Sequence, residues 1–333
     1  MIRVGILGYG YWGPNIVRNL DSIESTCVEV VCDKSPQALA RLKRAHPNIP
    51  ATSDPSEVLT SPRIDAVAVI TPVWTHYDLA KKALENGKHV FVEKPFTSTS
   101  AQAEELIELA ARKNLTIMVD HTFLFTGAVR KIQELIKKGV LGDLYYYDSV
   151  RVNLGLFQHD VNVIWDLAPH DLSIMDFLIA QQAEAIVATG ERHLNGHEDI
   201  AFITIYFPQN IIAHINVNWL SPVKVRTTLI GGQKKMLVWN DLEADEKIKV
   251  YDKGVEITSP DGVRQLLVNY RSGDMWSPQL EQIEALRSEL GYFADCIENG
   301  KTPINDGPAG LRVVRMLEAA EKSIAKRGEL VRL

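Results

Sequence analysis

The sequence predicts an α/β chain with an N-terminal doubly wound parallel sheet and a C-terminal α+β domain with an open, mostly antiparallel sheet. Two observations carry this prediction. Apolar strand-like runs alternate with helical patterns through the first third of the chain, whereas period-two alternation between short polar turns dominates much of the rest. Strands that alternate with helices form right-handed crossovers and lie side by side in one parallel sheet. We therefore expect domains at 1–123 and 124–333.

Each element follows from its own pattern. In the first domain, helical patterns are clearest at 75–86 and 99–113, and strands are predicted at 2–7, 28–32, 64–70, 89–92 and 116–120. In the second domain, helices are predicted at 128–138, 163–180, 279–299 and 308–327. Its strands are predicted at 143–152, 184–193, 199–207, 211–219, 225–230, 235–239 and 247–251.

Composition excludes several classes of protein. The 333 residues are 46% hydrophobic and 23% charged, which is typical of a globular protein of about two domains. The net charge of −6 comes without a basic stripe, so no nucleic-acid partner is expected. No secretion signal and no apolar run of the ~20 residues that span a bilayer is visible. The cysteines show neither metal nor redox spacing, so we expect a cytoplasmic protein without a metal.

A glycine-rich turn carries the first functional signal. The pattern Gly8-x-Gly10-x-x-Gly13 follows the predicted strand at 2–7 and opens a helix. In such a turn, Gly8 allows the tight bend, Gly10 lets the backbone approach a pyrophosphate, and Gly13 lets helix and strand pack closely. The helix N-terminus adds free N–H groups and a partial positive charge. The pattern predicts a dinucleotide-binding Rossmann domain, with Tyr9, Tyr11 and Trp12 completing the binding turn.

Asp33 bears on which dinucleotide binds. It ends the second predicted strand, about twenty residues after Gly13, where a carboxylate accepts hydrogen bonds from ribose hydroxyls and repels a 2′-phosphate. This favours NAD over NADP, although the adjacent Lys34 would accommodate the phosphate. The alternative is that Asp33 only shapes the turn or caps the helix that follows.

Two further motifs supply acid–base groups. Lys94 lies at the carboxyl end of the predicted strand at 89–92, the edge of a parallel sheet where ligands bind, although a solvated loop lysine is the alternative. Asp166 and His170 are four residues apart, so on a helix they share one face, and the carboxylate can orient the imidazole. The alternative is an aspartate that caps the helix and a histidine that packs against it.

Together these motifs resemble the glucose–fructose oxidoreductase, inositol dehydrogenase and rhizopine-catabolism (Gfo/Idh/MocA) family over the whole chain. The matching motifs, in order, are the glycine turn, Thr71-Pro72, Glu93-Lys94-Pro95, Asp166-x-x-x-His170 and Pro303-Ile-Asn-Asp306-Gly307. The resemblance implies a Rossmann domain followed by a domain whose open sheet binds substrate and builds dimers or tetramers. It also implies that the Lys94–Pro95 peptide can be cis.

The resemblance further implies an enzyme that oxidises a hydroxyl of a sugar with NAD. Lys94 and His170 would flank the reacting hydroxyl, with Asp166 supporting them, and which of the two accepts the proton stays open. As an ammonium, Lys94 would stabilise developing alkoxide charge. The expected cofactor contacts beyond the glycine turn and Asp33 are Lys34, Thr71, Pro72, His76, Glu93, Lys94 and His121, with Trp74 near the nicotinamide.

The substrate is expected to be polar. The segment before the Asp166 helix is rich in hydrogen-bonding groups, as a sugar site requires. The candidate substrate-binding residues are Lys94, Arg151, Asn153, Gln158, His159, Asp160, Asp166 and His170. Val161 and Asn162 replace glycines that many members carry, and the segment 121–125 lacks an arginine often found there.

These departures argue against oxidation of inositol or free glucose. The subgroup that the chain most resembles occurs with nucleotide-sugar enzymes, and this resemblance implies oxidation of the 3-hydroxyl of a UDP-N-acetylhexosamine or its uronate. Its phosphates would bind Arg151, Lys224, Arg226 or Arg271. The alternatives are a free sugar or inositol dehydrogenase, a keto-sugar reductase and a non-catalytic NAD-binding regulator. A homodimer or homotetramer is expected through the second sheet, whose outward apolar positions are predicted to be Ile203, Ile205, Ile215, Val217 and Trp219.

Overall fold

The computed structural model describes residues 1–155, 160–194, 196–256 and 269–333. The chain divides into two compact units. Unit 1 comprises Met1–Phe125 and Ile283–Glu318, and unit 2 comprises Thr126–Gln282 and Ala319–Leu333. The first division falls close to the predicted boundary after residue 123. Residues 283–318, however, pack within the N-terminal unit and not with the domain predicted at 124–333.

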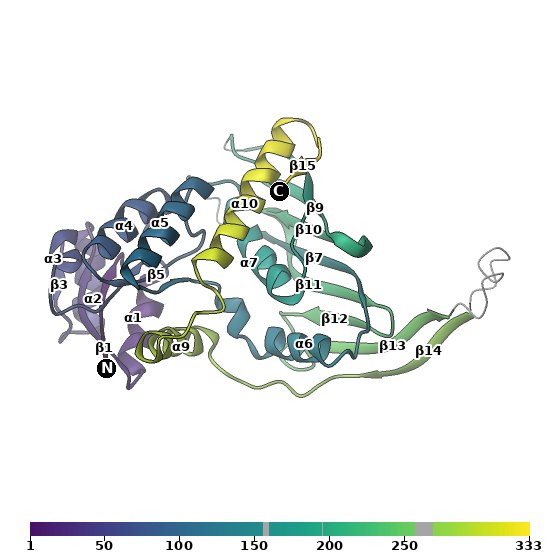
Figure 1. Ribbon diagram of the computed structural model, residues 1–333, viewed down its shortest axis with the longest axis horizontal. Helices are drawn as coiled ribbons and strands as arrows, with labels where there is room; N and C mark the ends of the chain where they lie inside the picture. Colours follow the sequence, from purple (N-terminus) through teal and green to yellow (C-terminus); the bar gives the residue numbers. More distant parts are fainter. Residues whose placement is uncertain (156–159, 195, 257–268) are drawn as a thin grey trace. The chain divides into compact units, whose positions relative to one another are not determined.

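Unit 1 contains a parallel sheet with helices on both faces (Figure 1). Its strands are β1 (Ile2–Leu7), β2 (Thr26–Cys32), β3 (Ala51–Thr52), β4 (Ala66–Val69), β5 (His89–Val92) and β6 (Ile117–Val119). Their order in the sheet is β3-β2-β1-β4-β5-β6, and every pair is parallel. The order reverses between β1 and β4, and the carboxyl ends of strands at such a reversal form a ligand-binding crevice. The predicted doubly wound sheet is confirmed.

The helices of unit 1 are α1 (Gly13–Ser22), α2 (Pro36–Ala45), α3 (Pro55–Leu59), α4 (His76–Glu85), α5 (Ser100–Lys113), α9 (Ala285–Asn299) and the greater part of α10 (Gly307–Ala325), with 3₁₀ turns at Val73–Thr75 and Thr122–Phe125. Of these helices, α4, α5 and α10 begin within one residue of their predicted starts at 75, 99 and 308, whereas α9 begins six residues after its predicted start at 279. Proline lies in the first turn of α1, α2 and α3, where its missing N–H has no helical partner to lose. The α9 helix joins the core of unit 1, with the ring centroids of Phe91 and Phe293 5.7 Å apart.

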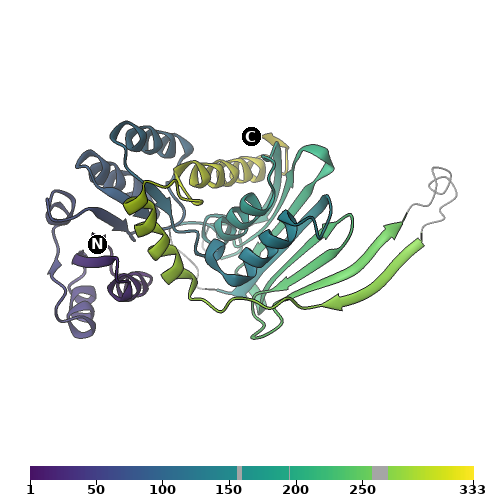
Figure 2. The same cartoon turned by 60° about the horizontal axis from the view of Figure 1, so that its bottom comes forward.

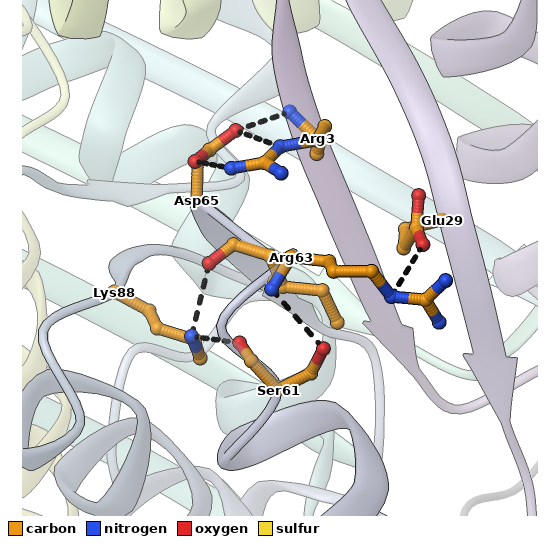
Figure 3. Close-up of polar contacts among 7 residues, drawn as sticks. Arg3, Glu29, Ser61, Arg63, Asp65 and Lys88 are labelled. Atoms are coloured by element: carbon orange, nitrogen blue, oxygen red, sulfur yellow. Dashed lines mark hydrogen bonds and ion pairs between the residues drawn. The ribbon is translucent and has the colours of Figure 1, made fainter.

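Charged side chains stabilise the edge of this sheet at the amino ends of its strands, opposite the carboxyl ends where ligands bind (Figure 3). The Asp65 carboxylate accepts hydrogen bonds from the Arg3 backbone N–H at 2.9 Å and from its guanidinium at 2.7 Å. The buried Lys88 donates to the carbonyls of Ser61 at 2.6 Å and Ile64 at 2.9 Å, and burial lowers the pKa of its ammonium. These contacts tie β1 to the loops that precede β4 and β5, so this edge is structural and the carboxyl edge is the one available for ligands.

Unit 2 is built on a second sheet. Its strands are β7 (Leu144–Leu154), β8 (Ala185–Glu191), β9 (Ile200–Tyr206), β10 (Ile212–Asn218), β11 (Leu220–Gly232), β12 (Met236–Asn240), β13 (Ile248–Glu256), β14 (Asn269–Trp276) and β15 (Val331–Arg332). Their order is β14-β13-β12-β11-β7-β10-β9-β8-β15, and all pairs are antiparallel except β7 with β10. The mostly antiparallel sheet is confirmed, whereas β14 and β15 were not predicted and the helix predicted from residue 279 begins at Ala285.

Helices α6 (Gly127–Lys137) and α7 (Val163–Leu178) cover one face of the unit 2 sheet (Figure 2), and a 3₁₀ turn at Pro208–Asn210 joins β9 to β10. The apolar positions predicted to point outward, Ile203, Ile205, Ile215, Val217 and Trp219, are all buried. That prediction is wrong because these side chains lie on the face that the helices cover. The residues at the alternate positions of β9 and β10 face away from the helices. Phe202, Tyr206 and Ile212 are 42%, 39% and 40% exposed.

Two further observations concern the whole described chain. Within the residues that the structure places, none of the helices is both long and apolar enough to cross a membrane. Cys27, Cys32 and Cys296 are free thiols, and burial raises the pKa of Cys32 to about 11.

Candidate functional site

The glycine-rich turn has the shape that a bound pyrophosphate requires. Gly8 has a φ of +104°, and a Cβ added there would lie 2.2 Å from the carbonyl oxygen of Ile70. A Cβ at Gly13 would lie 2.6 Å from the Gly8 carbonyl oxygen, whereas a Cβ at Gly10 would meet nothing within 4 Å. The N-cap residue of α1, Trp12, makes no capping hydrogen bond with its side chain. The open space at Gly10 and the uncapped helix end therefore suit a dinucleotide phosphate.

Asp33 connects the end of β2 to this turn. Its Oδ2 accepts a hydrogen bond from the Tyr9 backbone N–H at 2.6 Å, and its Oδ1 accepts one from the Ser35 N–H at 2.7 Å. Ser35, and not Asp33, is the N-cap of α2. The carboxylate thus shapes the turn, and it also lines the adjacent cavity, where ribose hydroxyls can reach its remaining lone pairs.

A cavity of about 470 Å³ opens beside the turn at the carboxyl ends of β1, β2 and β4. It contains seven of the residues predicted near the cofactor, together with apolar residues from α3 and α4. The lining residues are Leu7, Gly8, Gly10, Cys32, Asp33, Lys34, Pro55, Ile70, Thr71, Pro72, Trp74, Thr75, Asp78 and Leu79. Apolar walls with the carboxylates of Asp33 and Asp78 and the ammonium of Lys34 fit the adenosine part of a dinucleotide.

Sequence reasoning did not identify Pro55, Ile70 and Leu79, which line this cavity. None of them belongs to a motif, and an apolar residue in an α/β pattern predicts core. Only the strand order places them at one edge, although the position of Ile70 directly before Thr71-Pro72 was an available signal.

The remaining residues of the turn have different environments. Tyr9 is buried, and its carbonyl oxygen accepts a hydrogen bond from the Arg41 guanidinium at 3.0 Å. Tyr11 is 88% exposed. The Trp12 indole Nε1 donates to Asp120 Oδ2 at 3.0 Å. Cofactor contacts by these side chains stay predictions, but Trp12 already connects the turn to the end of β6.

His76 supports two loops that follow neighbouring strands. Its Nε2 lies 2.7 Å from the Thr71 carbonyl oxygen and its Nδ1 lies 2.9 Å from that of Pro95. The ring is fully buried, and desolvation lowers the pKa of the imidazole. His76 therefore holds the loops after β4 and β5 together from inside the unit, and its direct contact with a cofactor stays a prediction.

The Glu93-Lys94-Pro95 segment directly follows β5 at the carboxyl edge of the sheet. The Lys94–Pro95 peptide is cis, as the resemblance implies. Glu93 and Lys94 are half-buried, and Pro95 is buried. Lys94 thus begins a loop that His76 also holds, in the position where a parallel sheet presents residues to a ligand.

His121 follows β6 and is buried. Its backbone N–H donates to Glu289 Oε1 on α9 at 3.0 Å, and burial lowers the pKa of its imidazole to about 4. A neutral, buried His121 contributes to the interior of unit 1, and its predicted cofactor contact is not tested by these contacts.

In unit 2, α7 carries the predicted Asp166–His170 pair. The buried Asn162 caps this helix, its Oδ1 accepting from the Ile164 and Trp165 N–H groups, both at 3.1 Å. Asp166 is therefore not the cap that the alternative proposed. Its Oδ2 accepts a hydrogen bond from the Trp219 indole at 3.1 Å, and both Asp166 and His170 are half-buried.

Trp219 was not predicted as a site residue. It follows β10 and is buried, so its sequence signal was only that of an apolar strand end. Because the Trp219 indole N–H donates to the Asp166 carboxylate on α7, we assign to Trp219 the role of orienting Asp166.

The predicted substrate-binding residues of unit 2 are not all available to a ligand. Arg151 is buried and its Nε donates to Asp171 Oδ2 at 2.6 Å, which is a structural ion pair between β7 and α7. Asn153 is half-buried and Asp160 is exposed. Gln158 and His159 lie outside the described residues, as does the side chain of Arg271. Substrate binding by these residues stays a prediction.

Comparison with known proteins matches both units. A family model described as an oxidoreductase family with an NAD-binding Rossmann fold matches residues 2–121, and the Gfo/Idh/MocA C-terminal domain model matches residues 129–238. The scyllo-inositol 2-dehydrogenase (NAD(+)) of Bacillus subtilis is 27% identical over 91% of this chain and 87% of its own length. The UDP-N-acetylglucosamine 3-dehydrogenase of Acidithiobacillus ferrooxidans is 23% identical over 94% of each chain. An Escherichia coli oxidoreductase is 34% identical over 51% of each chain.

Solved structures share the fold. The UDP-N-acetylglucosamine 3-dehydrogenase GnnA of Acidithiobacillus ferrooxidans superposes with a TM-score of 0.80 at 22% identity, covering 98% of each chain. An oxidoreductase of Agrobacterium radiobacter, in complex with NAD+, L-tartaric acid and magnesium, gives a TM-score of 0.81 at 16% identity, covering 99% of this chain and 98% of that one. With the turn, the cavity and both domain models in agreement, the chain belongs to the Gfo/Idh/MocA family of NAD-dependent oxidoreductases.

Proposed function

We propose that this enzyme oxidises a secondary hydroxyl, at C3, of a UDP-N-acetylhexosamine or its uronate, with NAD as the hydride acceptor. The observation that carries the proposal is the placement of Lys94 directly after β5 in an NAD-binding unit, in a chain that also presents Asp166 and His170 on one face of α7. The match to a UDP-N-acetylglucosamine 3-dehydrogenase over 94% of both chains supports this substrate class.

The proposed roles follow from the chemistry of the side chains. Bound NAD supplies the hydride acceptor at its nicotinamide ring. Lys94 and His170 hold the substrate hydroxyl, and one of them takes its proton. Lys94 as an ammonium stabilises negative charge that develops on the oxygen, and Asp166 stabilises the charged form of His170. Trp219 holds Asp166 for that task through its indole N–H.

We also propose a preference for NAD over NADP. Asp33 lines the cavity with its carboxylate, which would repel a 2′-phosphate. Lys34 lines the same cavity, and among the lining residues named above it is the one with a positive charge, which would attract a 2′-phosphate. The preference is tested with the Asp33→Ser variant. We expect the dissociation constants of NAD and NADP to differ less in this variant than in the unmodified protein.

A free cyclitol or sugar is the second candidate substrate, favoured by the 27% identity to a scyllo-inositol 2-dehydrogenase. With the reaction in the reverse direction, the same residues would reduce a keto-sugar. A non-catalytic NAD-binding regulator is the third candidate, and the presence of both Lys94 and His170 argues against it, because sensing NAD requires neither.

The deciding experiment is a substrate panel, followed by nicotinamide absorbance. UDP-N-acetylglucosamine, its uronate, free N-acetylglucosamine, glucose, myo-inositol and scyllo-inositol are compared with the full chain. We expect turnover with the UDP-sugars alone and its loss in Lys94→Ala, whose NAD binding is measured separately by titration. Turnover with free sugars or inositols contradicts the UDP-sugar proposal, and tight NAD binding without turnover of any compound, in either direction, supports the regulator.

We propose, too, that the exposed face of the unit 2 sheet pairs with a second copy of the chain. Phe202, Tyr206 and Ile212 form an apolar group there, since Tyr206 is the register partner of Ile212 and Phe202 lies on the same face of β9. Exposed apolar groups of this kind mark protein interfaces. Phe202→Asp is expected to lower the mass measured by light scattering, and an unchanged monomeric mass for both proteins overturns the proposal.

A further inference from the structure

The cavity beside the glycine turn contains places for three parts of a nucleotide. Gly8 and Gly10 line it where a pyrophosphate meets the start of α1, and Asp33 lines it where the ribose of the adenosine half binds. The base of a nucleotide lies beyond its ribose. Pro55 of α3 and the helical stretch that runs from Val73 into α4 line the cavity as well, so these segments are left to meet the adenine.

The helical stretch presents one side to the cavity. Trp74 and Asp78 are four residues apart, as are Thr75 and Leu79, and all four line the cavity. Residues four apart on a helix are neighbours on its surface. Trp74, Leu79 and Pro55 thus give this part of the cavity apolar walls, against which a flat purine ring packs well.

The other polar groups near the adenine position are already engaged. Thr75 Oγ1 donates to the Pro72 carbonyl oxygen at 2.8 Å, and it lies 2.6 Å from Thr71 Oγ1. A hydroxyl has one proton, so Thr71 is the donor in the second contact and neither hydroxyl has a proton left for a base. The two oxygens of Asp33 each accept a hydrogen bond from a backbone N–H, at 2.6 Å and 2.7 Å.

The Asp78 carboxylate is available to a ligand. Asp78 is exposed, and within the part of the chain that the structure describes no group donates a hydrogen bond to its carboxylate or forms an ion pair with it. Adenine carries an amino group at C6, whose hydrogens are donors. A hydrogen bond to an ionised acceptor is stronger than one between neutral groups, so Asp78 is the acceptor best suited to this amino group.

We propose that Asp78 recognises the 6-amino group of adenine, so that the cavity selects an adenine dinucleotide over its 6-oxo counterpart, while Trp74 packs on the purine ring. In this arrangement Trp74 contacts the adenine and not the nicotinamide. The inference rests on dinucleotide binding by unit 1. It depends neither on the proposed sugar nor on the choice between NAD and NADP, which share adenine. It is tested without any sugar, so its failure and the failure of the proposed function are distinguishable.

The test compares NADH with reduced nicotinamide hypoxanthine dinucleotide, in which a carbonyl oxygen replaces the 6-amino group. Fluorescence titration of the full chain at neutral pH gives both dissociation constants. A carbonyl oxygen beside a carboxylate brings two acceptors together, so we expect the unmodified protein to bind NADH about tenfold more tightly, as for one hydrogen bond to a charged group. Equal affinities overturn the proposal, and so does failure of both dinucleotides to bind.

Asp78→Asn tests the carboxylate itself. An amide can accept from an amino group through its oxygen or donate to a carbonyl through its nitrogen, so we expect this variant to bind the two dinucleotides within about threefold of each other. A tenfold preference retained by Asp78→Asn overturns the proposal.

Trp74→Ala tests the packing on the ring. We expect it to weaken the binding of both dinucleotides by similar factors, because stacking uses the ring face that the two purines share. Unaltered binding of both dinucleotides by Trp74→Ala contradicts the role of Trp74.

The matched control is Glu57→Gln. Glu57 is an exposed acid in the first turn of α3, as Asp78 is in the first turn of α4, but it does not line the cavity. Acidic residues in a first turn stabilise a helix through its dipole, so both variants are expected to lower the melting temperature slightly. Only Asp78→Asn is expected to change the ratio of the two dissociation constants. The same change of ratio in Glu57→Gln would mean that helix stability sets the preference, and the proposal would be wrong.

Discussion

At the carboxyl end of β6, burial lowers the pKa of the His121 imidazole to about 4, and desolvation lowers the pKa of His76 as well. In the folded protein both groups take up protons only at a lower pH than in the unfolded chain, where a histidine is protonated near pH 6.5. The unfolded state therefore binds more protons as the pH falls, and the contribution of these groups to stability, fully present above pH 6.5, is lost on acidification.

The expected result is a falling free energy of unfolding between pH 6.5 and 4. His121 alone is expected to account for about 2 kcal/mol of this loss by pH 5. Urea unfolding at a series of pH values measures the slope, and His121→Asn should make it shallower even if that variant is less stable throughout. An identical slope in the variant would show that His121 does not titrate in this way.

The Trp219 indole makes a separate prediction for catalysis. Trp219→Phe removes the donor to Asp166 Oδ2 and keeps most of the buried ring. We expect kcat to fall by about tenfold, while the dissociation constant of NAD stays the same, because the change lies in unit 2. Steady-state kinetics with the substrate found by the panel, together with NAD titration, separates the two quantities.

Trp165→Phe is the matched control for that measurement. Trp165 is another buried tryptophan and directly precedes Asp166 on α7. A similar fall in kcat for both variants would mean that the loss comes from packing around α7 and not from the indole contact with Asp166.

At the scale of elements, the contact between β7 and α7 depends on the buried pair of Arg151 and Asp171. Ser149 also donates to Asp171 Oδ1 at 2.6 Å, so the carboxylate has donors on both oxygens. Removing one partner of a buried pair leaves an uncompensated charge.

Arg151→Met is therefore expected to lower the free energy of unfolding by about 3–5 kcal/mol. Arg151→Met combined with Asp171→Leu should recover part of that loss, because the second change removes the stranded carboxylate. Chemical denaturation measures both variants. If Arg151→Met were as stable as the unmodified protein but failed to bind substrate, the residue would have the ligand role that the sequence suggested.

Sequence patterns predict some elements of this chain and not others. Five of the six strands of unit 1 and the start of α1 follow from local signals: apolar runs, glycines with fixed roles and proline in first turns; the two-residue strand β3 was not predicted. The strand β14 follows no clear alternation, since Arg271, Gly273 and Asp274 interrupt it, and it exists through its pairing with β13. The pairing energy depends on both strands, so a prediction made from the sequence of one strand underestimates it.

At the scale of the whole chain, unit 1 is discontinuous. Residues 283–318 supply Phe293 to its core and Glu289 and Asn305 to its buried polar network. A fragment that ends at residue 125 would expose the surface that α9 covers.

We expect residues 1–125 alone to be insoluble or partly unfolded, and not to bind NADH. A fragment that joins residues 1–125 to 283–318 through a flexible linker is expected to fold cooperatively and to bind. Circular dichroism and NADH titration compare the two fragments. Native-like binding by residues 1–125 alone would show that the C-terminal helices are dispensable for this unit.

The sequence by itself determined the alternation of strands and helices, the glycine turn, and the motifs that carry Asp33, Lys94, Asp166 and His170. Such features depend on a few neighbouring residues, and local sterics and periodicity are enough to specify them. Only the tertiary structure decided that Arg151 is buried with Asp171, that Trp219 holds Asp166, and that α9 brings Glu289 to the backbone N–H of His121. Each of these contacts joins residues far apart in the chain, and burial, which sets their charge and availability, arises only when the elements pack together.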